Sequence, residues 1–398
     1  MINQRTYEIL ASSLISAGEN VVNSILRNLL RVNKLLTKNP YDVSKAKKIY
    51  DQNLNSVMKQ YKKNYKTWTE KELAKAYLEG LRRAEKELKA YGLNARIIDN
   101  ASNVSTVLLN RSNAIIPSIP EIPGQTILMF EGLERHIEYF GVFRSAAYYS
   151  LEGTELQILR KANDLFRDVA VMAGEQHFKE SDIFTRRRLS QTMLNNFAKR
   201  GVNCITYKDG RNFSIDSYCE MVGRTMSGRC ALQSSINRYY ESGYKLVMVS
   251  SHFRACPLCT PYEGEILSVD GKHQFYQSLA DAELQGLFHP NCAHNVTSYH
   301  EGLTEKNLPS VDPFEQKLID EYGYKDAQKI TYLAQQQQRY IERQIRKYKR
   351  VDAVAISKGD SEKARSKIRY WQSRQRDHLQ EHQYLPRKYI REQIKVAH

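Results

Sequence analysis

The chain has 398 residues, enough for two or three domains and for a hydrophobic core that needs no disulfide bond. It carries 60 Lys and Arg against 44 Asp and Glu, a formal net charge of +16, with the excess mainly in the first hundred and last eighty residues. This distribution favours a polyanionic partner, most often nucleic acid. Cys204, Cys219 and Cys230 lack the spacing of a disulfide framework, and we find no secretory leader and no apolar run near the roughly 20 residues of a membrane span. These features argue against a secreted or membrane-inserted protein. We therefore expect synthesis in a reducing cytoplasm.

Apolar residues at helical spacing dominate the first part of the chain. The clearest single helix opens at Thr69, whose spacing to Glu72 is typical of a capping box, and ends at Gly92. An earlier apolar stripe indicates a helical hairpin or bundle. Its members are Leu14, Val21, Ile25, Leu29, Val32 and Leu36. We predict an N-terminal helical region over residues 1–112.

Prolines interrupt the helical pattern after this region. Pro117, Pro120 and Pro123 stand three residues apart, which favours an extended strap and excludes a helix. The sequence therefore predicts a Pro-rich linker or arm at 113–130, followed by a central helical region over 131–201.

The pattern then changes to short strands and turns. CITYKDGRNFSI, with a turn at Asp209-Gly210, predicts a hairpin, and Ser217 begins a predicted helix to Tyr240. YKLVMVSS predicts a buried strand, and a second hairpin turn is expected at Asp270-Gly271, before a short helix in SLADAELQGLF. We predict a small α+β domain over 202–308 within a mainly α protein.

Three of the six cysteines gather with three histidines in two short stretches of this domain. These are SHFRACPLCTPYEG at 251–264 and LFHPNCAHNV at 287–296. Paired ligand motifs in this order are much rarer by chance than a single pair. They indicate a metal site, against the competing interpretation that the thiols are small buried apolar groups.

The ligand spacing favours zinc. Cys256 and Cys259 form a Cys-x-x-Cys knuckle, and His289 and Cys292 form a His-x-x-Cys pair. Three thiolates and one imidazole would make a closed tetrahedral Zn²⁺ site, which has no vacant position for water and is therefore structural. His294 is an alternate ligand, and the spacing alone does not decide between the two histidines.

Catalytic interpretations have weaker support. Zinc deaminases need a His-x-Glu before the cysteine pair, whereas His252 is followed by Phe253 and Arg254. Arg224 and His252 could line a cleft for phosphate or nucleotide chemistry, but their spacing defines no base or nucleophile. The sequence leaves enzymatic activity open and favours its absence.

A basic helix is predicted near the end of the chain, within a helical C-terminal extension over 309–398. Five cationic residues of ITYLAQQQQRYIERQIRKYKR at 330–350 fall on one broad face. They are Arg339, Arg343, Arg346, Lys347 and Arg350. This face is either solvated or a surface for phosphate or an acidic partner.

Several ordered blocks resemble the phage minor capsid protein 2 family, which is related to Mu-F-type head morphogenesis proteins. They are WTEKELAKAYLEGLRRAEKELKAYG, YKDGRNFSIDSYCEMVGRT, VMVSSHFRACPLCTPYEGEILSV with HPNCAH, and QQQQRYIERQIRKYKR. The resemblance covers most of residues 60–350. It implies a virion protein made in the cytoplasm of a bacterial host, held inside the phage head near the portal, and contacting the portal protein, the major capsid protein or packaged double-stranded DNA.

Two other functions stay open at this stage. One is an effector enzyme, nuclease-like or transferase-like, that is carried in the head, is released with the DNA and uses Arg224 and His252. The other is a zinc protein that binds nucleic acid in the host cytoplasm. The preferred hypothesis is a structural virion protein whose cysteines and histidines close a domain and whose basic helix faces DNA.

Overall fold

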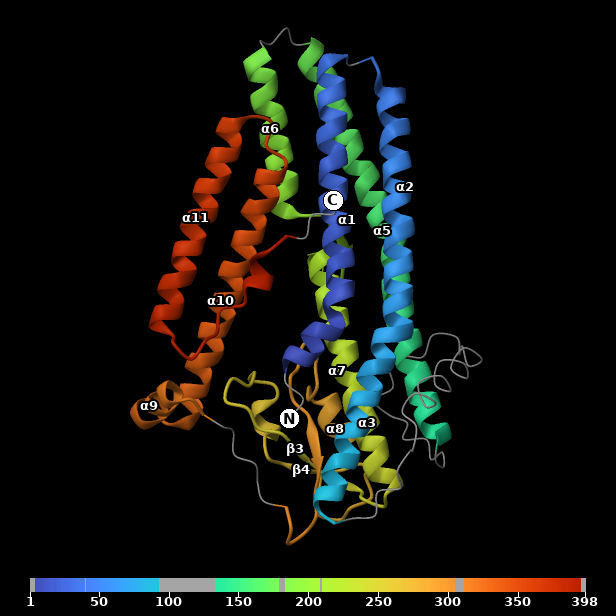
Figure 1. Cartoon of the computed structure of the whole chain (residues 1–398), viewed down its shortest axis with the longest axis vertical. Helices are drawn as coiled ribbons and strands as arrows, with labels where there is room; N and C mark the ends of the chain where they lie inside the picture. The colour runs from blue at the N-terminus through green and yellow to red at the C-terminus, as the bar shows by residue number, and fades with distance from the viewer. Residues whose placement is uncertain are drawn as a thin grey trace. The chain divides into compact units, whose positions relative to one another are not determined.

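The computed structural model describes residues 4–39, 41–92, 133–178, 183–207, 210–304 and 311–394. Figure 1 shows that these residues are mainly helical, as the sequence predicts, with few strands. The Pro-rich linker predicted at 113–130 lies outside the described residues. The division of the chain at residues 112, 130, 201 and 308 stays a prediction.

The elements follow in chain order. They are α1 (Gln4–Lys38), α2 (Val43–Thr67), a π-helical turn η1 (Trp68–Glu72), α3 (Leu73–Ala90), α5 (Leu133–Phe178), α6 (Ile183–Arg200), β1 (Asn203–Thr206), β2 (Asn212–Ser214), α7 (Ile215–Glu241), β3 (Leu246–Val249), the 3-10 turn η2 (Thr260–Tyr262), β4 (Ile266–Ser268), α8 (Leu279–Leu284), β5 (Val296–Ser298), α9 (Pro313–Tyr322), α10 (Tyr324–Ala353), α11 (Lys358–Glu381) and the 3-10 turn η3 (Tyr389–Glu392).

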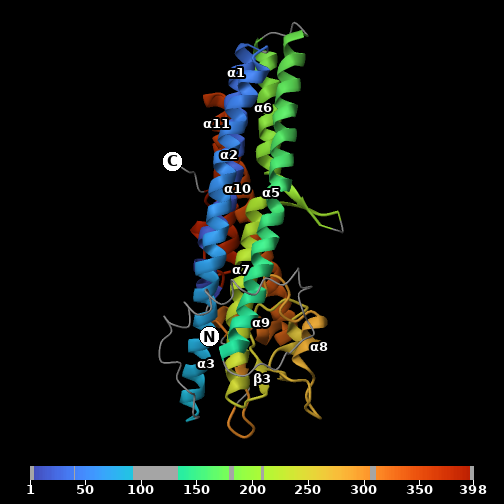
Figure 2. The ribbon, with the colours of Figure 1, turned by 90° about the vertical axis from the view of Figure 1, so that its right-hand side faces the viewer.

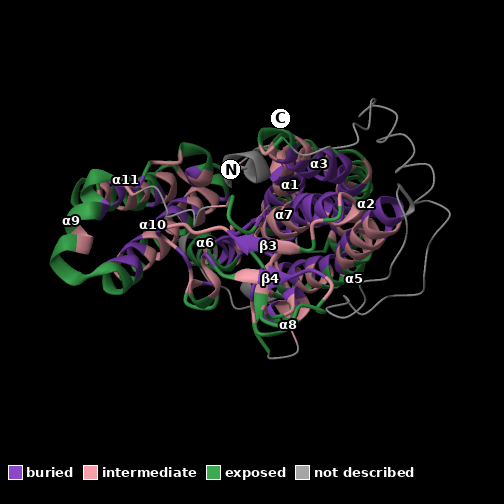
Figure 3. Cartoon of the chain, turned by 90° about the horizontal axis from the view of Figure 1, so that it is seen from below, coloured by how far each residue is buried: buried purple, intermediate pink, exposed green. Residues whose placement is uncertain are grey.

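The chain divides into two compact units, each built from segments that are distant in sequence. Unit 1 comprises Met1–Ser13, Tyr65–Ser150 and Met221–Tyr332. Unit 2 comprises Leu14–Asn64, Leu151–Glu220 and Leu333–His398. Figure 3 shows buried residues along the inner sides of the helices, whereas exposed residues predominate on α9 and α11.

Helix packing forms the core of unit 2. The predicted apolar stripe of α1 is buried from Leu14 to Leu36, with each member at most 3% exposed. Across the pair α2 and α5, the Tyr50 hydroxyl donates to the Ala162 carbonyl at 2.8 Å, and the Tyr61 and Thr154 hydroxyls are 3.0 Å apart. The β1–β2 hairpin, turned at Gly210 as predicted, projects outward from these helices (Figure 2).

Helix α1 is more apolar than the sequence analysis expected. By length and composition its Ile9–Lys38 part could cross a membrane, but half of the apolar window is buried inside the protein. A core helix meets the same criterion, so this is weak evidence for a span.

The C-terminal helices of unit 2 confirm the predicted helical extension. Ile341 and Ile345 of α10 are buried, and the Arg350 guanidinium lies 3.2 Å from the Asp216 carboxylate. Burial opposes ionisation of Asp216, but Arg350 and the Ser214 hydroxyl hold its pKa below the ordinary value. Asp216 lies in the first turn of α7, which begins at Ile215 rather than at the predicted Ser217.

Unit 1 is organised by a close crossing of α3 and α7. The Gly80 carbonyl accepts a hydrogen bond from Ser235 at 2.8 Å, and a Cβ atom at Gly80 would lie 2.0 Å from the Ala231 carbonyl oxygen. The predicted helix start at Thr69 is wrong. Its hydroxyl donates to the Lys66 carbonyl inside the π-helical turn that joins α2 to α3. The predicted end near Gly92 is confirmed, since α3 ends at Ala90 and Gly92 has a φ of 69°.

A three-stranded antiparallel sheet with the order β4-β3-β5 packs on these helices. Val247 pairs with Leu267 on one side and with Ser298 on the other. The second hairpin predicted at Asp270-Gly271 is wrong, because β4 pairs with the preceding strand β3. Asp270 instead accepts from the Lys272 backbone in a turn that leads to α8, the predicted short helix.

The Gly80 crossing gives a testable prediction. We expect Gly80→Ala to lower the free energy of unfolding by about 2 kcal/mol or more, because the clashing atom belongs to a backbone that cannot move alone. Gly153→Ala is the matched control, since open space surrounds Gly153 in α5 and alanine favours helix by up to about 1 kcal/mol. Denaturant unfolding would measure both. Equal stability of the two variants would contradict the crossing.

Candidate metal centre

The Cys-x-x-Cys knuckle lies in the connection between β3 and β4. Its backbone turns tightly, with the amides of Cys259 and Thr260 both donating to the Cys256 carbonyl. The chain reverses at Gly264, which has a φ of 72° and donates to the Val249 carbonyl at 3.0 Å. Glycine suits this left-handed conformation because it has no side chain to clash. The knuckle is therefore held at the end of a buried strand.

The His-x-x-Cys pair lies in the loop between α8 and β5. The Cys292 amide donates to the His289 carbonyl at 2.9 Å, and Phe288 and Asn291 have positive φ angles of 56° and 67°. Because β5 pairs with β3, this loop returns to the strand that carries the knuckle. The sheet register thus brings together two motifs that are far apart in sequence.

The four predicted ligands converge, and the alternate ligand His294 joins them. The Cys256 sulfur lies 2.8 Å from His289 Nε2, and the Cys259 sulfur lies 3.5 Å from that of Cys292. His294 Nδ1 is 3.3 Å from the Cys292 sulfur. Cys259 belongs to two groups whose donor atoms lie within 4.8 Å of one another, one with Cys256 and His289 and one with Cys292 and His294.

Contacts within the cluster change the acidity of its thiols. Hydrogen bonding to neighbouring cysteines lowers the pKa of Cys259 and of Cys292, whereas contact with Cys259 and burial raise that of Cys256 to about 11. Hydrogen bonds to thiols raise the pKa of His289 to about 10. Metal binding requires thiolates and a neutral imidazole nitrogen, so a bound ion would displace the protons that these groups share.

Hydrogen bonds orient both imidazole rings. His289 Nδ1 lies 2.8 Å from the Pro290 carbonyl, which leaves Nε2 toward Cys256. His294 Nε2 lies 3.2 Å from Glu263 Oε1, with Nδ1 toward Cys292. Metal-ligating histidines commonly bind a carbonyl or carboxylate through the second ring nitrogen. The donor set and its surroundings thus fit a zinc ion.

Two residues of α7 that the sequence analysis did not identify support the ligand loop. The Thr225 hydroxyl accepts from the Asn291 amide at 3.1 Å, and the Arg229 guanidinium donates to the Phe288 carbonyl at 3.0 Å. Both bonds involve residues with positive φ. The i,i+4 spacing of Thr225 and Arg229 was the available signal, but sequence alone does not place the loop against this face.

The two predicted catalytic candidates lie on different elements. Arg224 is on α7, and His252 follows β3, where its ring centroid lies 3.9 Å from that of His294. Their proposed use in phosphate or nucleotide chemistry stays a prediction.

The predicted basic face of α10 is partly used for internal contacts in unit 2. Arg346 donates to the Arg391 carbonyl and lies 4.0 Å from the Glu220 carboxylate, and Arg350 pairs with Asp216. Among the residues that the structure describes, Arg343 and Lys347 have no ion-pair partner. Arg343 is exposed, and Lys347 is half-buried with its ammonium over the Tyr348 ring.

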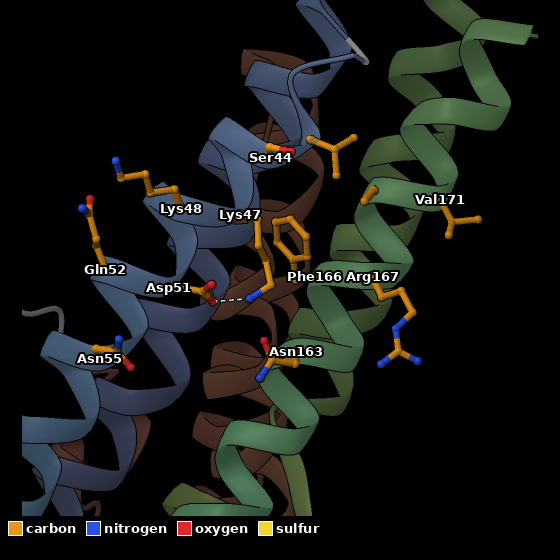
Figure 4. A pocket seen from close by; sticks show the side chains of 12 residues that line it. Ser44, Lys47, Lys48, Asp51, Gln52, Asn55, Asn163, Phe166, Arg167 and Val171 are labelled. Carbon is orange, nitrogen blue, oxygen red and sulfur yellow. Dashed lines mark hydrogen bonds and ion pairs between the residues drawn. The ribbon is translucent and has the colours of Figure 1, made fainter.

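Unit 2 also has an open groove of about 1020 Å³ between α2 and α5 (Figure 4). Figure 4 shows Phe166 inside it and the ion pair of Lys47 with Asp51 at its edge. Its lining contains no cysteine or histidine. The groove therefore offers no metal-ligating set like that of unit 1.

Comparisons with known proteins give a consistent result. A family model described as phage minor capsid protein 2 matches residues 147–380. A structural protein of Lactococcus phage LL-H is 30% identical over 201 residues, 48% of this chain and 51% of that protein. A structural protein of Lactococcus phage mv4 is 36% identical over 107 residues, 26% of this chain and 77% of that protein. The chain thus spans about half the length of the LL-H protein. No solved structure matches.

Proposed function

The chain belongs to the phage minor capsid protein 2 family of virion structural proteins, and we propose that it is held inside the phage head near the portal, in contact with packaged double-stranded DNA. The portal protein and the major capsid protein would be its protein partners. The observation that carries the DNA contact is the set of exposed basic side chains on α10 and α11, because the family match by itself does not name a ligand.

The α10–α11 hairpin combines positive charge with aromatic rings. Helix α11 has seven Lys and Arg residues against four Asp and Glu. The Tyr340 ring of α10 lies 5.8 Å from Trp371 of α11, and Lys367 lies over the Tyr370 ring. Exposed cations of this kind bind phosphate without reading base sequence, so the contact would be independent of DNA sequence.

The metal centre would have a structural role. Cys256, Cys259, His289 and Cys292 would bind one Zn²⁺ and close unit 1 by tying the β3–β4 connection to the loop before β5. Three thiolates and one imidazole complete a tetrahedral set, so this ion would have no open position for a reacting water. Its binding free energy would add to the stability of unit 1.

We expect Cys259→Ala to lose the thiolate-bound zinc and to lower the melting temperature by several degrees or more, because Cys259 lies at the centre of the cluster. Cys204→Ala is the control, since Cys204 lies outside the cluster. Elemental analysis with thermal unfolding, with and without a chelator, would measure both effects. Unchanged zinc content and stability in Cys259→Ala would refute the structural zinc site.

Protease treatment of purified virions tests the proposed location. We expect trypsin to leave this chain uncut in intact heads and to cleave its exposed Lys and Arg residues after the heads are opened. An externally exposed protein of the same virions, cleaved in both samples, would control for trypsin activity. Cleavage of this chain in intact virions would contradict an interior location.

DNA binding would test the basic surface. We expect the triple variant Arg343→Gln, Lys367→Gln and Arg374→Gln to weaken binding equally to duplexes of different sequence. The slope of log affinity against log salt should fall by about 0.9 for each phosphate that the variant no longer neutralises. Fluorescence anisotropy over a salt series would measure it.

The charge-matched control is the triple variant Lys59→Gln, Lys63→Gln and Lys66→Gln on the exposed face of α2. An equal loss of affinity in the control would show a general charge effect and count against the hairpin. A strong preference for one duplex would contradict binding through phosphate alone.

A further inference from the structure

A second group of ligand-type side chains lies beside the cysteine cluster in unit 1. The donor atoms of His252, Glu263 and His294 all lie within 4.8 Å of one another. They come from the end of β3, the turn before β4 and the loop before β5. The same sheet that gathers the thiolates therefore gathers two imidazoles and a carboxylate.

His252 has an unsatisfied polar atom in this group. Its Nε2 is buried and has no hydrogen-bond partner among the described residues. Leaving a buried polar atom without a partner is unfavourable by about 1–3 kcal/mol. The ring packs against His294 with 3.9 Å between centroids, so both imidazoles are held together on one side of Glu263. A bound cation would give Nε2 the missing partner.

Glu263 is held in place by donors on both of its oxygens. Oε1 accepts from the His252 backbone amide at 2.6 Å, and Oε2 accepts from the Gln328 side chain at 2.8 Å. Each carboxylate oxygen can accept more than one hydrogen bond, so these bonds orient the group and leave it able to bind an ion. Gln328 is itself 3% exposed, so the hydrogen bond that orients Glu263 is shielded from water.

The orientation of His294 separates the two clusters. Its Nδ1 faces the Cys292 sulfur at 3.3 Å, and its Nε2 faces Glu263 at 3.2 Å. If His289 completes the thiolate set, the Nδ1–H of His294 donates to Cys292. In the metal-free protein Nε2–H donates to Glu263, and a cation bound by the second group would take the place of that proton.

We propose that His252, Glu263 and His294 bind a second divalent transition-metal ion, of the class of Zn²⁺, Mn²⁺ or Fe²⁺, beside the thiolate site. Two imidazoles and one carboxylate suit these ions, and three protein ligands leave coordination positions for water. The inference rests on the proposed function in one respect, the assignment of His289 to the thiolate-bound zinc.

Cobalt titration of the metal-free full-length protein tests this inference. We expect two Co²⁺ ions per chain, one with thiolate charge-transfer absorption and one without it. His252→Gln and Glu263→Gln should each bind one ion fewer and keep the charge-transfer bands. The exposed residues His273 and Glu265 provide the matched controls His273→Gln and Glu265→Gln, which should still bind two ions.

A single ion per chain in the wild type, with charge-transfer absorption, would overturn the second site. So would a second ion that both His252→Gln and Glu263→Gln retain. Cys259→Ala should lose the charge-transfer bands and keep one ion, and adding His252→Gln to this variant should remove that ion. This result would support both sites.

Absence of charge-transfer bands in the wild type, with one ion that His252→Gln removes, would refute the thiolate site and leave the second one standing. If circular dichroism shows that Glu263→Gln misfolds, His252→Gln decides the result, because its Nε2 has no hydrogen bond to lose.

Discussion

Strand β3 is the element on which the rest of the candidate site depends. It pairs with β4 and β5, and Val247 and Val249 belong to a buried cluster with Leu267 and Val296. Because β3 is buried and paired on both edges, the loops that adjoin β4 and β5 are restricted in conformation. Cys256 therefore meets His289, and Cys259 meets Cys292, although 33 residues separate the members of each pair.

Helix α3 fixes this sheet on the rest of unit 1. The Glu87 carboxylate accepts from the backbone amide and hydroxyl of Ser298 and from the Tyr239 hydroxyl, so it joins β5 to α7. The Gly80 crossing permits that arrangement because it allows the α3 and α7 backbones to approach closely. The candidate ligands are thus positioned by helices whose own contacts lie well outside the two Cys/His motifs.

Positive charge in this protein has two physical roles. Arg346 and Arg350 belong to the basic face of α10, yet both are mostly buried and lie near carboxylates. A buried guanidinium needs such partners because desolvation is costly. Exposed cations of α11 such as Lys367 and Arg374 have no such requirement, and a counterion or DNA phosphate can neutralise them. Net charge alone therefore overstates how many cations can contact a polyanion.

The sequence by itself determined the mainly helical class, the first hairpin, the strand before Cys256, the short helix after the knuckle and the two Cys/His motifs whose side chains converge. These depend on local periodicity, turn chemistry and ligand spacing. The predicted helix start at Thr69 was wrong because the helix continues through this residue, which is buried there. The predicted hairpin at Asp270 was wrong because β4 pairs with the preceding strand β3. Only the tertiary structure decided how Thr225, Glu263 and Gln328 surround the candidate ligands and which arginines of α10 stay exposed. These contacts join segments that are far apart in the sequence, and local sequence patterns do not predict which distant segments pack together.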